Sequence, residues 1–412
     1  MQVVSQAQVA ERLEALAPNE PRIVVSGNFA TPWELVHLAA ATIPVFRFFV
    51  LNPQTGWPRR EGIITETPFV GAGVRDDDDL KYLPMRLSLV PRLFATSRPP
   101  DVVMVQTSTP RNGKVSLGIE TNLLPAAIEE VRRRGGLVIA QLNSQMPYTF
   151  GDSELVIDDI DVAIEVESTL PSPGERLADD AARTIGESVA SLCSDGATLQ
   201  LGIGLLPDAA LDQMHHRRQL GVWSEMVSDG IMRLDRAGAI DVNRVMTSTF
   251  LFGTPELYEW ADENPRLVMR RTEVANNPAR IADQPAMLSI NTALQVDLYA
   301  QSNASFVRGR IYSGFGGQPD FVSGALHSRG GQAVLALRSW HDKSDASNIV
   351  ALLDNPVCSF QHSSIVTEQG IAPIFGFSQQ SQALSLIEHA AHPRARGALA
   401  EAAQRMHLLG SD

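Results

Sequence analysis

Two apolar runs, DVVMVQTS at residues 101–108 and GLVIAQLN at 136–143, flank the segment LLPAAIEEVRRRGG at 123–136. The apolar runs are typical of parallel strands that are buried on both faces. The middle segment has acidic residues before a basic last turn and ends at a glycine pair, a pattern that favours a helix and its C-terminal stop. The stretch therefore predicts a right-handed βαβ unit.

The same alternation of apolar runs and helical segments continues through the chain. Together these segments predict an α/β protein with mostly parallel, open sheets and helices on their faces. The tail at 385–407 is expected to be helical with an interruption at Pro393. The other predicted strands are 21–27, 44–51 and 161–167 in the first half, and 198–204, 238–253, 287–300, 333–339 and 363–370 in the second.

The chain has 412 residues, too many for one hydrophobic core, so we expect two tandem α/β domains. The stretch STLPSPGERL at 168–177 is rich in Pro, Ser and Gly, and a new helical segment follows at 179–196. Such a composition is typical of a linker. We therefore predict an N-terminal domain at 1–175 and a C-terminal domain at 176–412.

The composition excludes several classes of protein. There are 34 basic and 47 acidic residues, a net charge of −13, which disfavours binding to nucleic acid or anionic lipid. The start of the chain lacks the basic-then-apolar order of a signal peptide, and no apolar run approaches the roughly 18 residues of a membrane span. Cys193 and Cys358 stand far apart without CxxC spacing. We therefore expect a cytoplasmic protein without nucleic acid or membrane partners.

Three segments are candidates for chemistry. LGIGLLP at 201–207 joins a predicted strand to a helix, so its amides form either a tight turn or an anion site. Glu225 lies in WSEMVSDG at 223–230 and is either a structural carboxylate or a nucleophile or base. It follows Gly204 by 21 residues, enough for one helix and a return strand, which predicts neighbouring strand ends. GFGGQPDF at 314–321 is either a place where the chain closely approaches a ligand or another backbone, or a flexible loop.

Other residue types give weaker indications. Asn276, Asn277 and Asn291 offer amide groups, although asparagine is common in turns for structural reasons. The nine histidines form no HExxH or two-His-one-carboxylate pattern, so no metal site is predicted. No serine stands in a GxSxG elbow and neither cysteine has a visible base partner, which argues against Ser or Cys acyl transfer.

The motifs, taken in order, resemble the acetyl-CoA hydrolase/transferase family from about residue 99 to residue 392. The resemblance implies two α/β domains with an active-site cleft between them. The motifs that carry it are DVVMVQTSTPRNGKVSLG (101–118), IAQLNSQMPYTFGDS (139–153), DGATLQLGIGLLPDAAL (195–211), GVWSEMVSDGI (221–231), INTALQVDLYAQSN (290–303), YSGFGGQPDF (312–321) and VTEQGIA (366–372).

The same resemblance implies that Glu225 is the catalytic nucleophile, with Glu273 as a rival by position that looks like a support residue. In the family mechanism the carboxylate attacks an acyl-CoA thioester, and a mixed anhydride and then a glutamyl-CoA thioester follow. This ping-pong exchange implies acyl-CoA and a small carboxylic acid as substrates. It needs no metal and no tightly bound cofactor.

The resemblance also assigns substrate-binding and oxyanion-stabilising groups. Backbone amides would hold the negative oxygen of the intermediates, and amide side chains would lie near the acyl group. Segment 373–383 lacks the basic residues with which many relatives meet CoA phosphates, and Arg329, Arg338 and Lys343 are possible substitutes. The implied site residues are Ile203, Gly204, Gly316 and Gly317 for the backbone groups, Asn276 or Asn277 near the acyl oxygen, and Gln141, Asn143, Met146 and Pro147 across the cleft.

The sequence thus predicts a CoA-transferase that exchanges CoA between a short-chain acyl-CoA and a carboxylic acid through Glu225. Two alternatives stay open. One is an acyl-CoA hydrolase that uses the same glutamate and lets water intercept the intermediate. The other, of a different class, is a non-catalytic acyl-CoA-binding protein. The resemblance to the family also implies a homodimer or a higher homo-oligomer.

Overall fold

The computed structural model describes residues 1–174, 178–357 and 361–409, and the chain forms two compact units. The predicted domain boundary between residues 175 and 176 lies outside the described residues, as does Cys358. Unit 1 comprises Met1–Pro173, Met246–Ala275 and Tyr312–Gly316, and unit 2 comprises Gly174–Val245, Asn276–Ile311 and Gly317–Asp412.

Unit 1 is therefore not one continuous segment. The prediction of two consecutive domains did not place residues 246–275 or 312–316 with the first unit, where the structure has them. The returning segment supplies β15 (Met246–Ser248) and β17 (Leu267–Met269), which form a three-stranded parallel sheet with β9 (Phe150–Gly151). Backbone pairing with an earlier strand is what draws this segment into unit 1.

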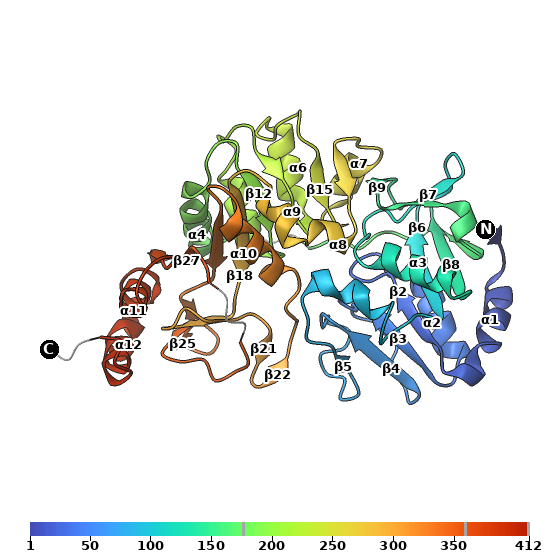
Figure 1. Ribbon diagram of the computed structural model, residues 1–412, viewed down its shortest axis with the longest axis horizontal. Coiled ribbons are helices and arrows are strands. Elements are labelled where there is room, and N and C mark those ends of the chain that lie inside the picture. The colour runs from blue at the N-terminus through green and yellow to red at the C-terminus, as the bar shows by residue number, and fades with distance from the viewer. Residues whose placement is uncertain (175–177, 358–360, 410–412) are drawn as a thin grey trace. The chain divides into compact units, whose positions relative to one another are not determined.

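The main sheet of unit 1 has eight strands, all parallel (Figure 1). The predicted βαβ unit is present, because α3 (Leu124–Arg133) connects β6 to its neighbour β8. In sheet order the strands are β1 (Gln2–Val3), β11 (Val162–Val166), β8 (Leu137–Asn143), β6 (Val102–Thr107), β2 (Arg22–Val25), β3 (Phe46–Val50), β4 (Ile63–Thr67) and β5 (Lys81–Tyr82).

Helix α3 shows how the apolar pattern becomes core. Ile128 and Val131 on the helix are buried in one cluster with Val103 of β6 and Val138 of β8. Each such buried aliphatic side chain contributes about 1.5–3 kcal/mol. The other elements of unit 1 are α1 (Gln6–Glu14), η1 (Ala17–Asn19), α2 (Trp33–Thr42), η2 (Leu87–Leu93), β7 (Lys114–Ser116), β10 (Glu154–Val156), η3 (Ile157–Asp159), β16 (Phe250–Leu251), α7 (Pro255–Ala261) and α8 (Thr272–Ala275).

Unit 2 is built on a six-stranded sheet whose first five strands are parallel and whose edge strand β28 is antiparallel. Helix α10 packs on β18 and β23 (Figure 1). Helix α5 packs on β18. In sheet order the strands are β13 (Gly221–Val222), β12 (Thr198–Leu201), β18 (Met287–Thr292), β23 (Gln332–Ala336), β27 (Ser364–Thr367) and β28 (Gly370–Pro373).

Two predicted helices of unit 2 are present: the segment at 179–196 forms α4 (Asp180–Ser191), and the helix predicted after the glycines of LGIGLLP is α5 (Leu205–Asp212). The predicted interruption of the tail at Pro393 is present, because residues 391 and 392 are not helical and α12 begins at this proline. At the first position of a helix, proline lacks only an amide that has no partner in the helix. The helices are α4 (Asp180–Ser191), α5 (Leu205–Asp212), α6 (Asp229–Arg236), α9 (Pro278–Ala282), α10 (Gln318–His327), α11 (Gln379–Ser385), η4 (Leu386–Ala390) and α12 (Pro393–Arg405). The remaining strands are β14 (Met226–Val227), β19 (Gln295–Asp297), β20 (Ser302–Asn303), β21 (Phe306–Val307), β22 (Arg310–Ile311), β24 (Trp340–His341), β25 (Ala346–Ser347) and β26 (Ile349–Val350).

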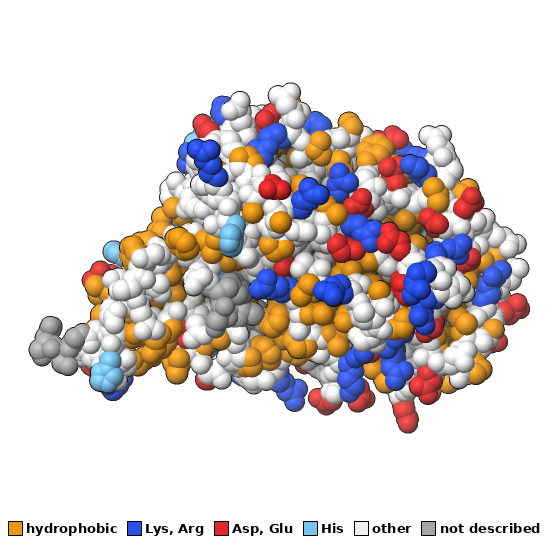
Figure 2. All heavy atoms as spheres, in the orientation of Figure 1, with side chains coloured by type: hydrophobic (Ala, Val, Ile, Leu, Met, Phe, Trp, Pro, Cys, Tyr) orange, Lys and Arg blue, Asp and Glu red, His pale blue; other side chains and the backbone are white. Residues whose placement is uncertain are grey.

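The surface carries both signs of charge. On the face shown in Figure 2, acidic and basic side chains are intermixed. Within the described residues, no helix is long and apolar enough to cross a membrane.

Candidate active site

Glu225 lies at the carboxyl edge of the sheet in unit 2, in the segment that follows β13. Strand β13 is parallel to β12, so the segments that follow these two strands leave the same edge side by side. The amide of Leu201 at the end of β12 donates to Ser224 Oγ over 3.2 Å. The LGIG turn and the glutamate are therefore neighbours, as their spacing in the sequence predicts.

Asn276 and Gly317 both contact the Glu225 carboxylate. Asn276 Nδ2 donates to Glu225 Oε2 over 2.8 Å. The backbone amide of Gly317 also donates to the carboxylate. Gly317 is the residue that precedes α10, so the carboxylate lies at a helix N-terminus, where the dipole favours negative charge.

Glycine is required at position 317. A Cβ there would lie 1.8 Å from Glu225 Oε2 and 2.3 Å from Asn276 Nδ2. Because real Cβ atoms do not approach other heavy atoms so closely, any side chain would displace the carboxylate or the amide that holds it. The glycine loop thus closely approaches the side chain of Glu225, whereas its predicted approach to a ligand stays a prediction.

The surroundings raise the pKa of Glu225 to about 7, and burial of the carboxyl group is the largest cause. Asp320 raises the pKa further, while the hydrogen bonds from Asn276 and Gly317 lower it. Near neutral pH a substantial fraction of Glu225 is therefore ionised. A carboxylate in that state is suited to attack a carbonyl carbon.

Asp320 is a member of the site that sequence reasoning missed. It is fully buried in the first turn of α10 and acts on Glu225 through its charge. An acidic residue in the first turn of a helix is common, because it complements the dipole. No signal in the sequence therefore distinguishes this aspartate from an ordinary one.

The structure separates the roles of the two consecutive asparagines. Asn276 is buried and reaches Glu225, and its Oδ1 atom has no hydrogen-bond partner within the described parts of the chain. Asn277 instead caps α9, since its side chain accepts the amide of Ala279 over 3.0 Å. Of the two predicted candidates, only Asn276 is placed against the glutamate.

The LGIG turn leads directly into α5. Ile203 is 45% exposed, and Gly204 is the residue before the helix, with φ of +131°. A Cβ on Gly204 would meet nothing within 4 Å, so its glycine serves the backbone conformation rather than a close approach. The predicted oxyanion role of these two amides stays a prediction.

Gly316 is the last residue of unit 1 before the chain enters unit 2. Its φ is +56°, and a Cβ there would lie 3.2 Å from the Phe69 ring. Its carbonyl oxygen accepts the amide of Leu87 over 3.1 Å. The peptide group between Gly316 and Gly317 is thus held at its carbonyl oxygen by the Leu87 amide.

The four residues predicted to face the acyl group lie in and after β8 of unit 1. Gln141 Oε1 accepts the amide of Glu34, and Asn143 Nδ2 donates to Ser168 O over 2.9 Å. Met146 and Pro147 are buried, and the Met146 side chain packs against Gly118. The polar atoms of the first two residues thus hold unit 1 together, and the predicted role of all four toward an acyl group stays a prediction.

Comparisons with known proteins identify the family of this chain. A family model described as the acetyl-CoA hydrolase/transferase C-terminal domain matches residues 253–403. The 4-hydroxybutyrate coenzyme A transferase of Clostridium kluyveri is 38% identical to this chain over 346 residues, which cover 80% of each protein. The chain belongs to the acetyl-CoA hydrolase/transferase family. The family that the motifs predicted is confirmed.

Two further comparisons concern the fold and the alternative activity. The crystal structure of RipA from Yersinia pestis has a TM-score of 0.88 and 27% identity, and the match covers 99% of this chain and 98% of that one. The acetyl-CoA hydrolase of Kluyveromyces lactis is 29% identical over 300 residues, 67% of this chain and 57% of the hydrolase. The predicted α/β class with mostly parallel sheets is confirmed.

Glu273, the rival glutamate of the family motif, is tied to arginine. Arg271 Nη2 pairs with Glu273 Oε1 over 2.8 Å and with Glu129 Oε2 over 2.9 Å. A carboxylate held by a guanidinium is a poor nucleophile, because its charge is already compensated. These contacts agree with a support role for Glu273.

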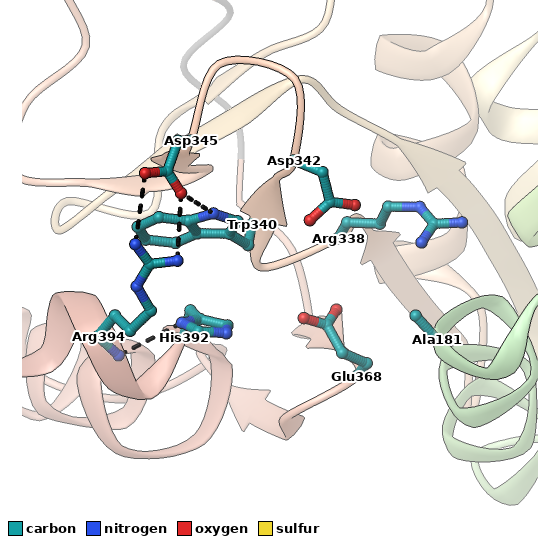
Figure 3. Close-up of a pocket in the computed structure, with 8 residues that line it drawn as sticks. All are labelled: Ala181, Arg338, Trp340, Asp342, Asp345, Glu368, His392 and Arg394. Atoms are coloured by element: carbon teal, nitrogen blue, oxygen red, sulfur yellow. Dashed lines mark hydrogen bonds and ion pairs between the residues drawn. The ribbon is translucent and has the colours of Figure 1, made fainter.

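A pocket in unit 2 bears on the missing basic residues of segment 373–383. Arg338 Nη2 is bound by both Asp179 oxygens over 2.9 Å, and Arg394 pairs with Asp345 and lies over the Trp340 ring (Figure 3). Both guanidinium groups of the pocket are thus already paired. The pocket has a volume of about 250 Å³ and is lined by Ala181, Arg338, Trp340, Asp342, Asp345, Glu368, His392 and Arg394.

This pocket is poorly suited to CoA phosphates. Its lining has three carboxylates against two paired arginines, so a phosphate would meet net negative charge. The use of Arg338 as a phosphate contact therefore has little support here. Separately, the described residues contain no group of three or more His, Cys, Asp or Glu side chains arranged to hold a metal ion.

Proposed function

We propose that this protein is a CoA-transferase that moves CoA from a short-chain acyl-CoA to a carboxylic acid, with Glu225 as the nucleophile. One observation carries the proposal. The Glu225 carboxylate is held by the Asn276 amide and the Gly317 backbone N–H, and its pKa is raised to about 7. Membership of the acetyl-CoA hydrolase/transferase family supplies the class of reaction.

The chemistry runs in two half-reactions. A Glu225 oxygen bonds to the thioester carbonyl carbon, the C–S bond breaks, and CoA leaves as the thiolate, which yields an acyl–glutamyl anhydride. The thiolate then attacks the Glu225 carbonyl carbon and releases the acyl group as a carboxylate, which leaves a glutamyl-CoA thioester. An incoming carboxylate reverses both steps and carries CoA away, so Glu225 is regenerated.

Backbone amides support these steps in the proposal. Each addition to a carbonyl carbon develops an oxyanion, and one preorganised donor typically contributes about 3–4 kcal/mol. The Gly317 amide already directs its N–H at the reacting carboxylate. We assign the amides of Ile203 and Gly204 to the same task, because their turn and Glu225 leave neighbouring strand ends.

Transfer is favoured over hydrolysis. The named transferase relative is more similar to this chain, and over a larger share of it, than the named hydrolase relative. The Clostridium kluyveri name also supports a short acyl group such as hydroxybutyryl. A cleft between the two units, a cytoplasmic location, a homo-oligomer and the lack of a tightly bound cofactor stay predictions.

A trapping experiment tests the proposal. The protein is incubated with a short-chain acyl-CoA and treated with borohydride, which reduces a glutamyl thioester to an alcohol, and the peptide containing residue 225 is analysed by mass spectrometry. We expect reduction at Glu225 in the parent protein and none in Glu225→Gln.

The competing functions give other results. Release of free CoA without an acceptor acid, at the rate of exchange with one, would indicate the hydrolase. Absence of any covalent species, together with tight acyl-CoA binding, would indicate the non-catalytic binder. Entry of labelled carboxylate into acyl-CoA at the parent rate in Glu225→Gln would overturn the assignment of the nucleophile.

A further inference from the structure

The peptide group between Gly316 and Gly317 is hydrogen-bonded at both ends. Its carbonyl oxygen, on Gly316, accepts the amide of Leu87 over 3.1 Å. Its N–H, on Gly317, donates to the Glu225 carboxylate. Each hydrogen bond lies within one unit, and the covalent peptide group is shared by both.

A peptide group is planar, so the direction of its C=O fixes the direction of its N–H. Here the residues on both sides are glycines, and Gly316 has φ of +56°, in a region that few other residues adopt. Glycine on both sides leaves rotation of the whole plane unusually free. An anchor on the carbonyl oxygen is therefore needed to keep the N–H directed at Glu225.

Leu87 is well placed to be that anchor. It is the first residue of η2, and the first amides of a helix have no partner within the helix. Its side chain is 2% exposed and is part of the buried core cluster of unit 1. The Leu87 N–H is thus both available as a donor and fixed in place.

We propose that the backbone amide of Leu87 is a positioning group for catalysis, which fixes the Gly316–Gly317 peptide plane so that the Gly317 N–H holds Glu225. The inference rests on the proposed function of Glu225 as the nucleophile. It assigns no contact with substrate to Leu87. Loss of the Leu87 N–H frees the plane, and the carboxylate then loses the Gly317 donor.

The local backbone offers a specific variant. Proline has no N–H and is tolerated at the first position of a helix. Arg86, the preceding residue, has φ of −65° and ψ of 143°, which is the conformation that a following proline requires. Leu87→Pro therefore removes the donor at a helix position that accepts proline. Leu87→Ala is the matched control, since it truncates the same side chain and keeps the N–H.

We expect kcat for CoA exchange to be at least about tenfold lower in Leu87→Pro than in Leu87→Ala, with a smaller change in KM. The reason is that one preorganised amide donor typically contributes a factor of about 100 to 1,000 to kcat. The acid limb of the pH–rate profile is a second readout. The charged group that faces Glu225 is Asp320 on α10, while Asn276 and Gly317 face it as neutral donors. Losing the Gly317 donor removes one of the hydrogen bonds that lower the pKa of Glu225, while the Asn276 donor remains, so the acid limb should move to higher pH.

Equal kcat values and equal acid limbs in the two folded variants would overturn the inference. Should Leu87→Pro not fold, replacement of Leu87 by its α-hydroxy acid removes the N–H and keeps the side chain, and the same comparison then applies. Borohydride trapping separates the two hypotheses. A parent protein with no adduct at Glu225 refutes the proposed function, whereas a normal parent adduct with equal variants refutes only the role of Leu87.

Discussion

At the scale of single residues, Glu225 owes its chemistry to groups that come from distant parts of the chain. Asn276 reaches it from 51 residues away, and Gly317 reaches it from the start of α10. Burial raises the pKa of the carboxyl group, and the two donors oppose that effect without cancelling it. The result is a carboxylate that is ionised near neutral pH yet little compensated.

Gly317→Ala tests the close approach at the carboxylate. The new methyl group would overlap Glu225 Oε2, so we expect transfer activity to fall about 100-fold or more. The φ of Gly317 is −89°, which alanine adopts freely, so the variant should fold. The measurement is kcat/KM for exchange, beside circular dichroism. Activity at the parent level would show that the carboxylate does not need this position.

Glu225→Gln tests the raised pKa through stability. Because the pKa is about 7 in the folded protein and near 4.5 in the unfolded chain, the native state binds more protons between these values. The protonated Glu225 side chain therefore contributes to the free energy of unfolding at low pH, and this contribution is lost as the pH rises through 7. Glutamine escapes this loss, so Tm of the variant should exceed the parent Tm at pH 8 by more than at pH 5.

The size of that effect is bounded. The rise in pKa from 4.5 to about 7 corresponds to at most about 3–4 kcal/mol, since one pKa unit is worth about 1.4 kcal/mol. Differential scanning calorimetry at the two pH values measures it. A Tm difference that is the same at pH 5 and pH 8 would contradict a raised pKa for Glu225.

At the scale of elements, helix termini and helix contacts place the reactive groups. Helix α10 presents the Gly317 amide at its start, and α5 begins directly after the LGIG turn. Helix α5 is itself held by α4, because Gly186 of α4 lies against the backbone of Ala209 in α5. The packing of these helices therefore sets the position of the turn beside Glu225.

Gly186→Ala tests this helix contact. A Cβ at this position would lie 2.5 Å from Ala209 O, so the two helices must separate, and we expect a loss of about 1–3 kcal/mol in the free energy of unfolding. Gly397→Ala in α12 is the matched control. Nothing lies within 4 Å of its Cβ, so this change should stabilise the protein by about 0.5–1 kcal/mol. Chemical denaturation measures both. Similar values for both variants would show that α4 and α5 do not pack this closely.

At the scale of the whole molecule, two units share the 412 residues without dividing them in order. Residues 246–275 and 312–316 return to unit 1, where β15 and β17 pair with β9 and Gly316 binds Leu87. The sequence pattern of 238–253 predicted a strand of the second domain. It instead contributes two short strands to unit 1, because hydrophobic pattern reports burial and not the sheet that provides it.

The sequence by itself determined the elements and the family. Apolar runs with the period of buried strands predicted β6, α3 and β8 to within a few residues, since local pattern and helix-end residues are sufficient for that. The order of the motifs identified the family and singled out Glu225. Spacing also predicted that Glu225 and the LGIG turn leave adjacent strands, which the register of β12 and β13 confirms.

Only the tertiary structure decided how the glutamate is held. It selected Asn276 over Asn277, added Asp320, and tied the Gly316–Gly317 peptide to Leu87. These relations depend on the direction of individual N–H and C=O groups that meet after long returns of the chain. Residue type and spacing carry no information about such directions, because the same amide or glycine in another backbone conformation would point elsewhere.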